Sequence, residues 1–332
     1  MATLAVGDLV IPQMLLDYVL AQTTYRSAFV GSGAAMVEPI QIAGAGGNTW
    51  TARDLAPYSS RPVAADGTTA TAVKHTARAY ISPVFRRRFY FNMNEEIKAA
   101  LGEQNAARLQ ALIQADQANL WPKEFDLAFI DICKAAFDTS SGVLRSTNSY
   151  SSIAASATAA DVPFTMGGYV AAKAKLGDAA DQLQALVVHS KVWGDIESAE
   201  SQRITFQAIT GPDGAFIEQA KYYNGKRVIV SDNVPTATSA SHTVYSSYLV
   251  GLGVFALGIQ KGQEVSSGKL LASGINELLY EMSFGTGCVG LNWTGSPSSA
   301  DSGATAAEIA TATNWTKVGA TKEVRIVEYR SN

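Results

Sequence analysis

The stretch Leu176–Pro235 decides the fold of this chain. It begins LGDAADQLQALVVHSKVWGDIE and, after a hydrophilic excursion, ends YYNGKRVIVSDNVP. Within it, the apolar runs Gln184–His189 and Lys226–Val230 each predict a short buried strand. Ser190 is a suitable N-cap for the helix that follows the first strand. The apolar face of that helix carries Val192, Trp193 and Ile196. No nucleophile lies beside a base in this stretch, so it predicts a compact platform without a reactive pocket.

The composition is that of a folded protein without a strong charge. The chain has 332 residues, of which 47% are hydrophobic, enough for one large core or two modest ones. Its formal charge of -3 argues against a protein that functions by gripping phosphates. Cys133 and Cys288 lie in an apolar helix pattern and an apolar strand pattern. We expect them to be free, buried thiols of a reducing compartment, and not a disulfide.

The first thirty residues are apolar but do not read as a targeting segment. They lack a basic start, they contain Asp8 and Asp17, and Pro12 interrupts them. Neither a signal peptide nor a membrane span is expected, so the chain should stay in the cytoplasm where it is made. From Pro12 onward the apolar spacing predicts a short amphipathic helix. That helix is either part of the core or an arm that docks on a neighbouring subunit, and the sequence does not choose between the two.

A long β-hairpin is predicted over Thr49–Tyr80. Its two strand-like segments flank PYSSRPVAADGTT, a stretch rich in turn residues. A hairpin of this length cannot bury both faces in its own domain, so it needs a partner surface. The segment ISPVFRRRFYF then continues as a strand. Alternation places Phe85, Phe89, Phe91 and Arg87 on one side of that strand, and Arg86, Arg88 and Tyr90 on the other. We expect these arginines to be ion-pair partners and not a phosphate-binding site, because one triplet makes too narrow a footprint.

The segment Asn94–Asp138 predicts the main helix, with Asn94 as its N-cap. Pro122 should kink this helix or start a new one. The acids Glu124, Asp126 and Asp131 are spread around the helix, so they indicate a solvated face and not a pair of catalytic carboxylates. Three further features follow in the sequence. These are a surface connection over Thr139–Ala160, a helix over Phe164–Gly177, and one or two buried strands over residues 243–260.

Short motifs that resemble catalytic or ligand-binding patterns lack the surrounding sequence that such sites require. The glycines of Gly251–Gly258 are followed by GIQKGQ, which does not open the helix that a dinucleotide site requires. Ser266 and Lys269 have the spacing of an acyl-enzyme motif, but this short pattern is common by chance. The histidines His75, His189 and His242 are too scattered to predict a metal site. We therefore predict no catalytic residues, no cofactor site and no metal site.

The order and wording of the pieces in Leu176–Pro235 resemble the A-domain of tailed-bacteriophage major capsid proteins with the Hong Kong 97-type (Johnson) fold. The C-terminal passage adds to the resemblance. SGINELLYEMSFGTGCVGLNWTG gives an apolar strand pair, and ATAAEIATATNWTKVGATKEVRIVEYRSN gives a short helix, a tryptophan-containing turn and a final strand. The resemblance implies an α+β fold with an N-terminal arm, an extended E-loop hairpin, a P-domain with a spine helix, and an A-domain.

The resemblance also implies a division of the chain. The arm would be residues 1–48, the E-loop hairpin with its following strand 49–90, the spine part of the P-domain 91–140, and the A-domain 141–262. Residues 263–332 would supply the return strands of the P-domain and a C-terminal A-domain segment. Pro122 departs from a straight spine helix.

The implied function is that of a structural subunit of an icosahedral head. It would form hexamers and pentamers around double-stranded DNA, without binding DNA sequence-specifically, in the host cytoplasm and then in the virion. Portal and decoration proteins are further expected partners, and no membrane is involved. An encapsulin-type nanocompartment is the alternative within the same fold. An enzyme on an α+β scaffold is the alternative from another class, and a cleft with a perturbed acid or base would favour it.

Overall fold

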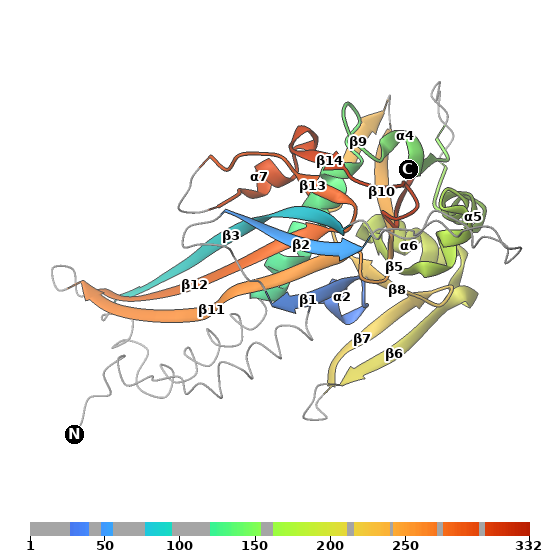
Figure 1. Ribbon diagram of the computed structural model, residues 1–332. Coiled ribbons are helices and arrows are strands. Elements are labelled where there is room, and N and C mark those ends of the chain that lie inside the picture. The colour runs from blue at the N-terminus through green and yellow to red at the C-terminus, as the bar shows by residue number, and fades with distance from the viewer. Residues whose placement is uncertain are drawn as a thin grey trace, which may run out of the picture.

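The computed structural model describes residues 27–39, 48–55, 77–94, 120–153, 162–210, 216–239, 242–270, 275–298 and 303–332. Two β-sheets lie side by side, and a long helix is buried between them and beneath the first (Figure 1). Strands of the first sheet extend away from the body as long ribbons, while the second sheet and its helices form a more compact unit. The predicted α+β class is confirmed. In the described part of the chain, no helix is long and apolar enough to cross a membrane.

The first sheet has five strands in the order β1-β11-β12-β3-β2. Its strands are β1 (Ala35–Pro39), β2 (Thr49–Leu55), β3 (Ala77–Asn94), β11 (Phe255–Leu270) and β12 (Ile275–Cys288). The β1–β11 pair is parallel, and the other pairs are antiparallel. The long strand β3 serves two partners: its first residues pair with β2, and its residues from Val84 onward pair with β12. The predicted β2–β3 hairpin is therefore confirmed at its base, while its tip lies outside the described residues.

The second sheet has eight strands, with the order β4-β15-β10-β5-β8-β7-β6 and with β9 paired to β10. Its strands are β4 (Ser149–Ser151), β5 (Leu183–Val188), β6 (Ile204–Thr210), β7 (Phe216–Tyr223), β8 (Lys226–Val230), β9 (Thr236–Ser239), β10 (His242–Gly251) and β15 (Ile326–Ser331). The central pair β5–β8 is parallel. Strand β5 is buried on both faces, as its continuous apolar sequence predicts.

The helix that spans residues 120–136 of the described chain lies under both sheets. Its aromatic rings reach the first sheet, where Phe125 packs against Phe284 of β12 and Phe129 stacks on Phe255 of β11. Just past its end, Phe137 stacks on Tyr248 of β10 in the second sheet. Residues 120 and 121 are helical on the N-terminal side of Pro122, and whether the helix is kinked or begins anew there depends on residues outside the described part of the chain. The predicted cap at Asn94 and the helix up to residue 119 lie outside the described residues.

Two helices cover the other face of the second sheet. They are α5 (Met166–Ala174) and α6 (Ser190–Ala199). Helix α5 lies close to β15, and Gly168 permits this because a side chain there would collide with the Tyr329 ring. The three predicted apolar residues of α6 are buried, and Trp193 is only 4% exposed. The platform predicted from Leu176–Pro235 is thus confirmed as a three-layer unit of helices, sheet and helix.

Local corrections concern where helices begin and end. The N-cap of α6 is His189 and not Ser190, because the His189 ring nitrogen accepts a hydrogen bond from the Lys191 amide. Helix α5 ends at Ala174, earlier than predicted, and a 3-10 turn η2 (Gly177–Gln182) follows. Gly177 does adopt the left-handed conformation (φ 57°) that helix ends favour.

Two segments that we predicted to be irregular contain regular structure. The connection Thr139–Ala160 includes α4 (Arg145–Asn148) and β4, and Asn148 within it is fully buried. The hydrophilic excursion after α6 contains the hairpin β6–β7, which follows the short 3-10 helix η3 (Ser201–Arg203). Near the N-terminus, a short helix α2 (Ala28–Gly31) precedes β1. The amphipathic helix predicted from Pro12 onward lies outside the described residues.

The C-terminal passage contains the predicted strands, short helix and final strand, but Trp315 begins a strand that pairs with Leu291–Trp293 and does not lie in a turn. It contains β13 (Leu291–Trp293), α7 (Ala306–Ile309), the 3-10 turn η4 (Ala312–Asn314), β14 (Trp315–Lys317) and the final strand β15. Trp315 packs edge-to-face on Trp293 with ring centroids 5.3 Å apart, and its indole nitrogen donates to the Ile309 carbonyl at 2.8 Å. A capping box at Thr305 and Glu308 begins α7.

Candidate functional site: projecting surfaces and buried anchors

The base of the β2–β3 hairpin is fixed firmly to the body. Trp50 of β2 and Tyr80 of β3 are each only 5% exposed. Gly287 of β12 lies against Ser82 and Trp50, where an added side chain would collide with Ser82. The Asn292 side chain of β13 accepts a hydrogen bond from the Ile81 amide at 3.0 Å. These contacts fix the base of the hairpin to β12 and β13.

All three arginines of the Arg86–Arg88 triplet in β3 were predicted to form ion pairs, and the structure shows such pairs for Arg87 and Arg88. Arg87 pairs with Glu124 of helix 120–136 at 3.1 Å and lies 5.0 Å from the centre of the Phe85 ring. Arg88 forms a cross-strand pair with Glu281 of β12. The predicted alternation is also confirmed, since Phe85 is buried and Tyr90 is 53% exposed. These arginines connect the strand to its neighbours and leave no broad basic footprint.

The carboxylate of Asp126 anchors the N-terminal segment, contrary to our prediction of a solvated acid. It accepts hydrogen bonds from the Ser27 hydroxyl at 2.6 Å and from the Ala28 amide at 3.0 Å. It therefore caps α2 from a distant helix, and Ser27 itself is fully buried. Burial raises the pKa of Asp126 to about 6, although the hydrogen bonds and the nearby Arg227 oppose this shift.

The other two acids of this helix lie in different surroundings. Glu124 is held by Arg87, as described above. Burial raises the pKa of Asp131 to about 6, and the opposing charge of Lys134 lowers it less. As their spacing predicted, the three acids do not share one site. All three are partly exposed, and the expectation of a solvated face fails most clearly for Asp126, whose carboxylate is held by the N-terminal segment.

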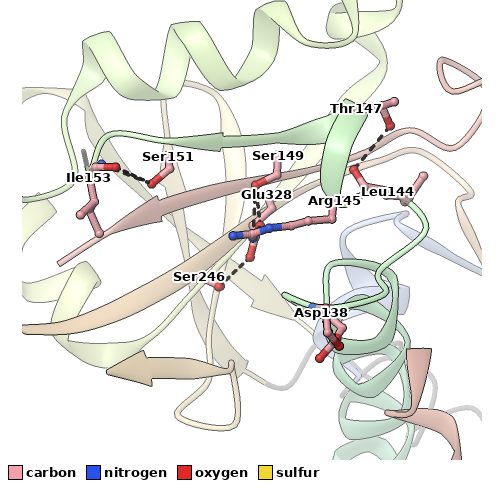
Figure 2. Close-up of polar contacts among 10 residues, drawn as sticks. Asp138, Leu144, Arg145, Thr147, Ser149, Ser151, Ile153, Ser246 and Glu328 are labelled. Atoms are coloured by element: carbon pink, nitrogen blue, oxygen red, sulfur yellow. Dashed lines mark hydrogen bonds and ion pairs between the residues drawn. The ribbon is translucent and has the colours of Figure 1, made fainter. Parts of the chain in front are cut away.

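A polar cluster around Glu328 joins the segment that follows helix 120–136 to the second sheet (Figure 2). Glu328 of β15 is 2% exposed and forms an ion pair with Arg145 of α4. Its carboxylate also accepts from the Ser149 hydroxyl at 2.6 Å and from the Ser246 hydroxyl at 2.8 Å. Three separate parts of the chain therefore meet at one carboxylate. We call these four residues the Glu328 cluster.

Asn148 reinforces the same junction. Its side-chain nitrogen donates to the Ile326 carbonyl at 2.9 Å, and longer bonds reach Val324 and Thr321. Strand β4 then pairs in parallel with β15. The sequence signal for this junction was weak, since Arg145 and Glu328 are 183 residues apart. An acid within an otherwise mostly apolar strand, Glu328 in IVEYRS, was the feature that could have suggested it.

The remaining candidates for chemistry are dispersed. Gly251–Gly258 forms a turn between β10 and β11 and leads into a strand, so the dinucleotide motif fails in its structural context. Ser266 and Lys269 both lie on β11. Cys133 and Cys288 are free and buried, and burial raises the pKa of both thiols. His189 faces Asp232 at 3.7 Å, His242 begins β10, and His75 lies outside the described residues. No three potential metal ligands gather among the described residues.

Comparisons with known proteins agree with this architecture. Residues 95–324 match the model of the Gp13-like family, described as major capsid protein 13-like. The major capsid protein of Bacillus phage SPP1 is 26% identical over 340 residues, covering 99% of this chain and 98% of that protein. A solved structure titled Cyanophage Pam1 capsid asymmetric unit has a TM-score of 0.53 and 12% identity, with 93% of each chain covered. A structure from Mycobacterium phage Bobi has a TM-score of 0.50 and 12% identity, covering 91% of this chain and 89% of that one.

The structural likenesses establish the fold, which is the Hong Kong 97-type fold of phage capsid proteins. The family model covers well over half of the chain and spans both the platform and the strands β11 and β12 of the first sheet. The expected resemblance is therefore confirmed by sequence and by structure: this chain belongs to the Gp13-like family of major capsid proteins.

Proposed function

We propose that this protein is the structural subunit of an icosahedral phage head, and that it assembles into hexamers and pentamers that enclose double-stranded DNA. Family membership carries the proposal, and the relatives named above are phage proteins, which favours a head over an encapsulin-type compartment. The protein would assemble in the host cytoplasm and remain in the virion. Its role would be structural and not catalytic.

The proposed role assigns each part of the chain to a domain of the capsid fold. Residues 1–48 would be the arm, 49–90 the E-loop hairpin, 91–140 the spine part of the P-domain, and 141–262 the A-domain. Residues 263–332 would return through both domains. Two facts support this division. Strands β11 and β12 lie in the first sheet, and the final strand β15 lies in the second. The chain passes between the sheets at the turn 252–254, just inside the proposed A-domain boundary.

Contact with DNA would be weak. The formal charge of -3 suits an inner wall that tolerates packed DNA without gripping it. The ion pairs of Arg87 and Arg88 also use part of the basic triplet for internal contacts. A portal protein, and decoration proteins on the outside, would be further partners of the shell.

The E-loop hairpin provides the most direct test. We expect deletion of Ser59–Thr69 to abolish shells while leaving a folded subunit, because the paired registers of β2 and β3 end outside the deleted stretch at Leu55 and Ala77. Negative-stain microscopy and light scattering measure assembly, and circular dichroism measures folding. A variant with the same stretch replaced by a Gly-Ser linker of equal length separates the role of its side chains from that of its length.

A wild-type protein that remains monomeric under all conditions that promote association would contradict the proposed function. A deletion variant that builds normal shells would leave that function intact but would remove the hairpin from the assembly contacts.

A further inference from the structure

Strand β6 forms the outer edge of the second sheet. One side of β6 pairs with β7 from Ile204 to Thr210, and within the described residues no strand pairs with its other side. The hairpin β6–β7 projects from the body in Figure 1. Strand β7 pairs with β8 only over Lys221–Tyr223, so the outer part of the hairpin is a ribbon of two strands. Such ribbons are marginally stable in water unless another surface supports them.

The sequence of β6 leaves this edge unprotected. It reads ITFQAIT, with no charge, no proline and no glycine. Natural proteins protect exposed strand edges with charges, proline, or very short strands, because an open edge invites pairing with another chain. Other edges of this protein carry such protection. Strand β2 contains Arg53 and Asp54, β1 ends at Pro39, and β4 has three residues.

The side chains of β6 extend an apolar surface beyond the core. Tyr223, at the base of the hairpin, is fully buried, and Ile204 lies opposite it. One step outward on the same face, Phe206 lies opposite Lys221, whose ammonium group is 5.1 Å from the centre of the Trp193 ring. Phe206 is 53% exposed. An open backbone edge and an exposed aromatic ring therefore occur together on one strand.

We propose that β6 is an intersubunit surface, on which a second copy of this chain pairs its backbone and covers Phe206. This inference rests on the proposed function, because in a shell each subunit is surrounded by further copies of itself. Strand addition draws its affinity from main-chain hydrogen bonds and its specificity from pockets for alternate side chains. An uncharged edge is tolerable in such a protein because assembly covers it.

The test introduces charge at this edge without touching the core. Thr205 and Gln207 are exposed and lie on the face of β6 opposite Phe206. We expect the double variant Thr205→Lys/Gln207→Lys to reduce the yield of shells by about tenfold or more, because lysines on an edge strand block edge pairing. Its melting temperature as a free subunit should match wild type. The control is Gln202→Lys, an equally exposed position just before the strand, which should assemble normally.

Hydrogen exchange on the wild-type protein gives an independent measurement. The peptide over residues 204–210 should exchange roughly tenfold more slowly in shells than in free subunits, because pairing protects the outer amides. Unchanged exchange on assembly, or normal shells from a folded double variant, would overturn the inference while leaving the proposed function intact. A wild-type protein that forms no shells would contradict both.

Discussion

Two carboxylates, Glu328 and Asp126, hold distant segments of this protein together, but they differ in what balances their charge. Glu328 has a cationic partner, Arg145, in addition to two hydroxyl donors. Asp126 has a hydroxyl and backbone amides as donors, and Arg227 acts on it only as a nearby charge. Hydrogen bonds and a nearby positive charge do not offset the cost of burying the Asp126 carboxylate, since burial raises its pKa to about 6.

The difference matters for the two junctions that these residues hold. The Glu328 cluster fixes the passage from helix 120–136 into the second sheet, and it does so with charge. Asp126 fixes the segment that leads into β1, and neutral hydrogen bonds could serve the same purpose. We therefore expect isosteric neutralisation to have opposite effects at the two sites.

The largest effect should come from Glu328→Gln. This change removes the charge but keeps the shape, and it leaves the Arg145 guanidinium without its partner in a site where 24% of that side chain is exposed. Breaking a buried pair by removing one member typically costs about 3–5 kcal/mol, and partial access to water places the expected loss near 3 kcal/mol. Urea unfolding of the free subunit, followed by fluorescence, measures it.

A double-mutant cycle controls this prediction. Arg145→Met combined with Glu328→Gln should recover part of the lost stability, because the unpaired cation is then gone. If Glu328→Gln alone unfolds at the wild-type urea concentration, the charge of Glu328 does not hold the junction.

A smaller effect is expected from Ser246→Ala. The hydroxyl of Ser246 donates to the Glu328 carboxylate at 2.8 Å, and a hydrogen bond to a charged group contributes about 1.5–3 kcal/mol. We expect a loss near the lower bound, because Ser149 and Arg145 still hold the carboxylate. Ser198→Ala is the matched control, since its exposed hydroxyl bonds only to the Asp195 carbonyl within its own helix. Equal losses for both variants would show that the cluster adds nothing beyond an ordinary surface hydrogen bond.

At neutral pH, Asp126→Asn should change the free energy of unfolding the least, and it should stabilise the protein where the other variants destabilise it. The asparagine oxygen can still accept from Ser27 and Ala28, while the cost of burying a charge disappears. Because the pKa of Asp126 is raised in the folded state, its contribution to stability is full below its ordinary value near 3.8 and is lost as pH rises through about 6. Wild type should therefore gain stability relative to the variant as pH falls from 7 to 4, by about 2 kcal/mol.

Asp131 must be separated from this measurement, because burial raises its pKa to about 6 as well. Asp131→Asn should remove its own share of the pH dependence, and the double variant should remove both. Melting curves at pH 4, 5, 6 and 7 for the four proteins resolve the two contributions. A pH profile of Asp126→Asn that is parallel to wild type would mean that Asp126 is not the titrating group.

The β2–β3 and β6–β7 hairpins show what the sequence predicts and what it does not. The β2–β3 hairpin was predicted because its strands alternate and its tip is rich in proline, glycine and serine. The β6–β7 hairpin was missed because its inner strand β7, with Glu218, Gln219 and Lys221, reads as hydrophilic chain. Strand β7 forms because it pairs with β8 and β6, and this pairing cannot be predicted from the residues of β7 alone.

The amino-acid sequence was sufficient to predict the α+β class, the platform of Leu176–Pro235, the apolar helix face that buries Trp193, and the resemblance to phage major capsid proteins. These follow from local periodicity and from the order of segments, which are properties of neighbouring residues. Two contacts became visible only in the folded structure: Asp126 caps α2, and Glu328 joins α4, β4 and β10. These contacts link residues between 82 and 183 positions apart. The free energy of a buried charge depends on its burial and on the partners that folding brings to it. Neither can be predicted from its neighbours in the sequence.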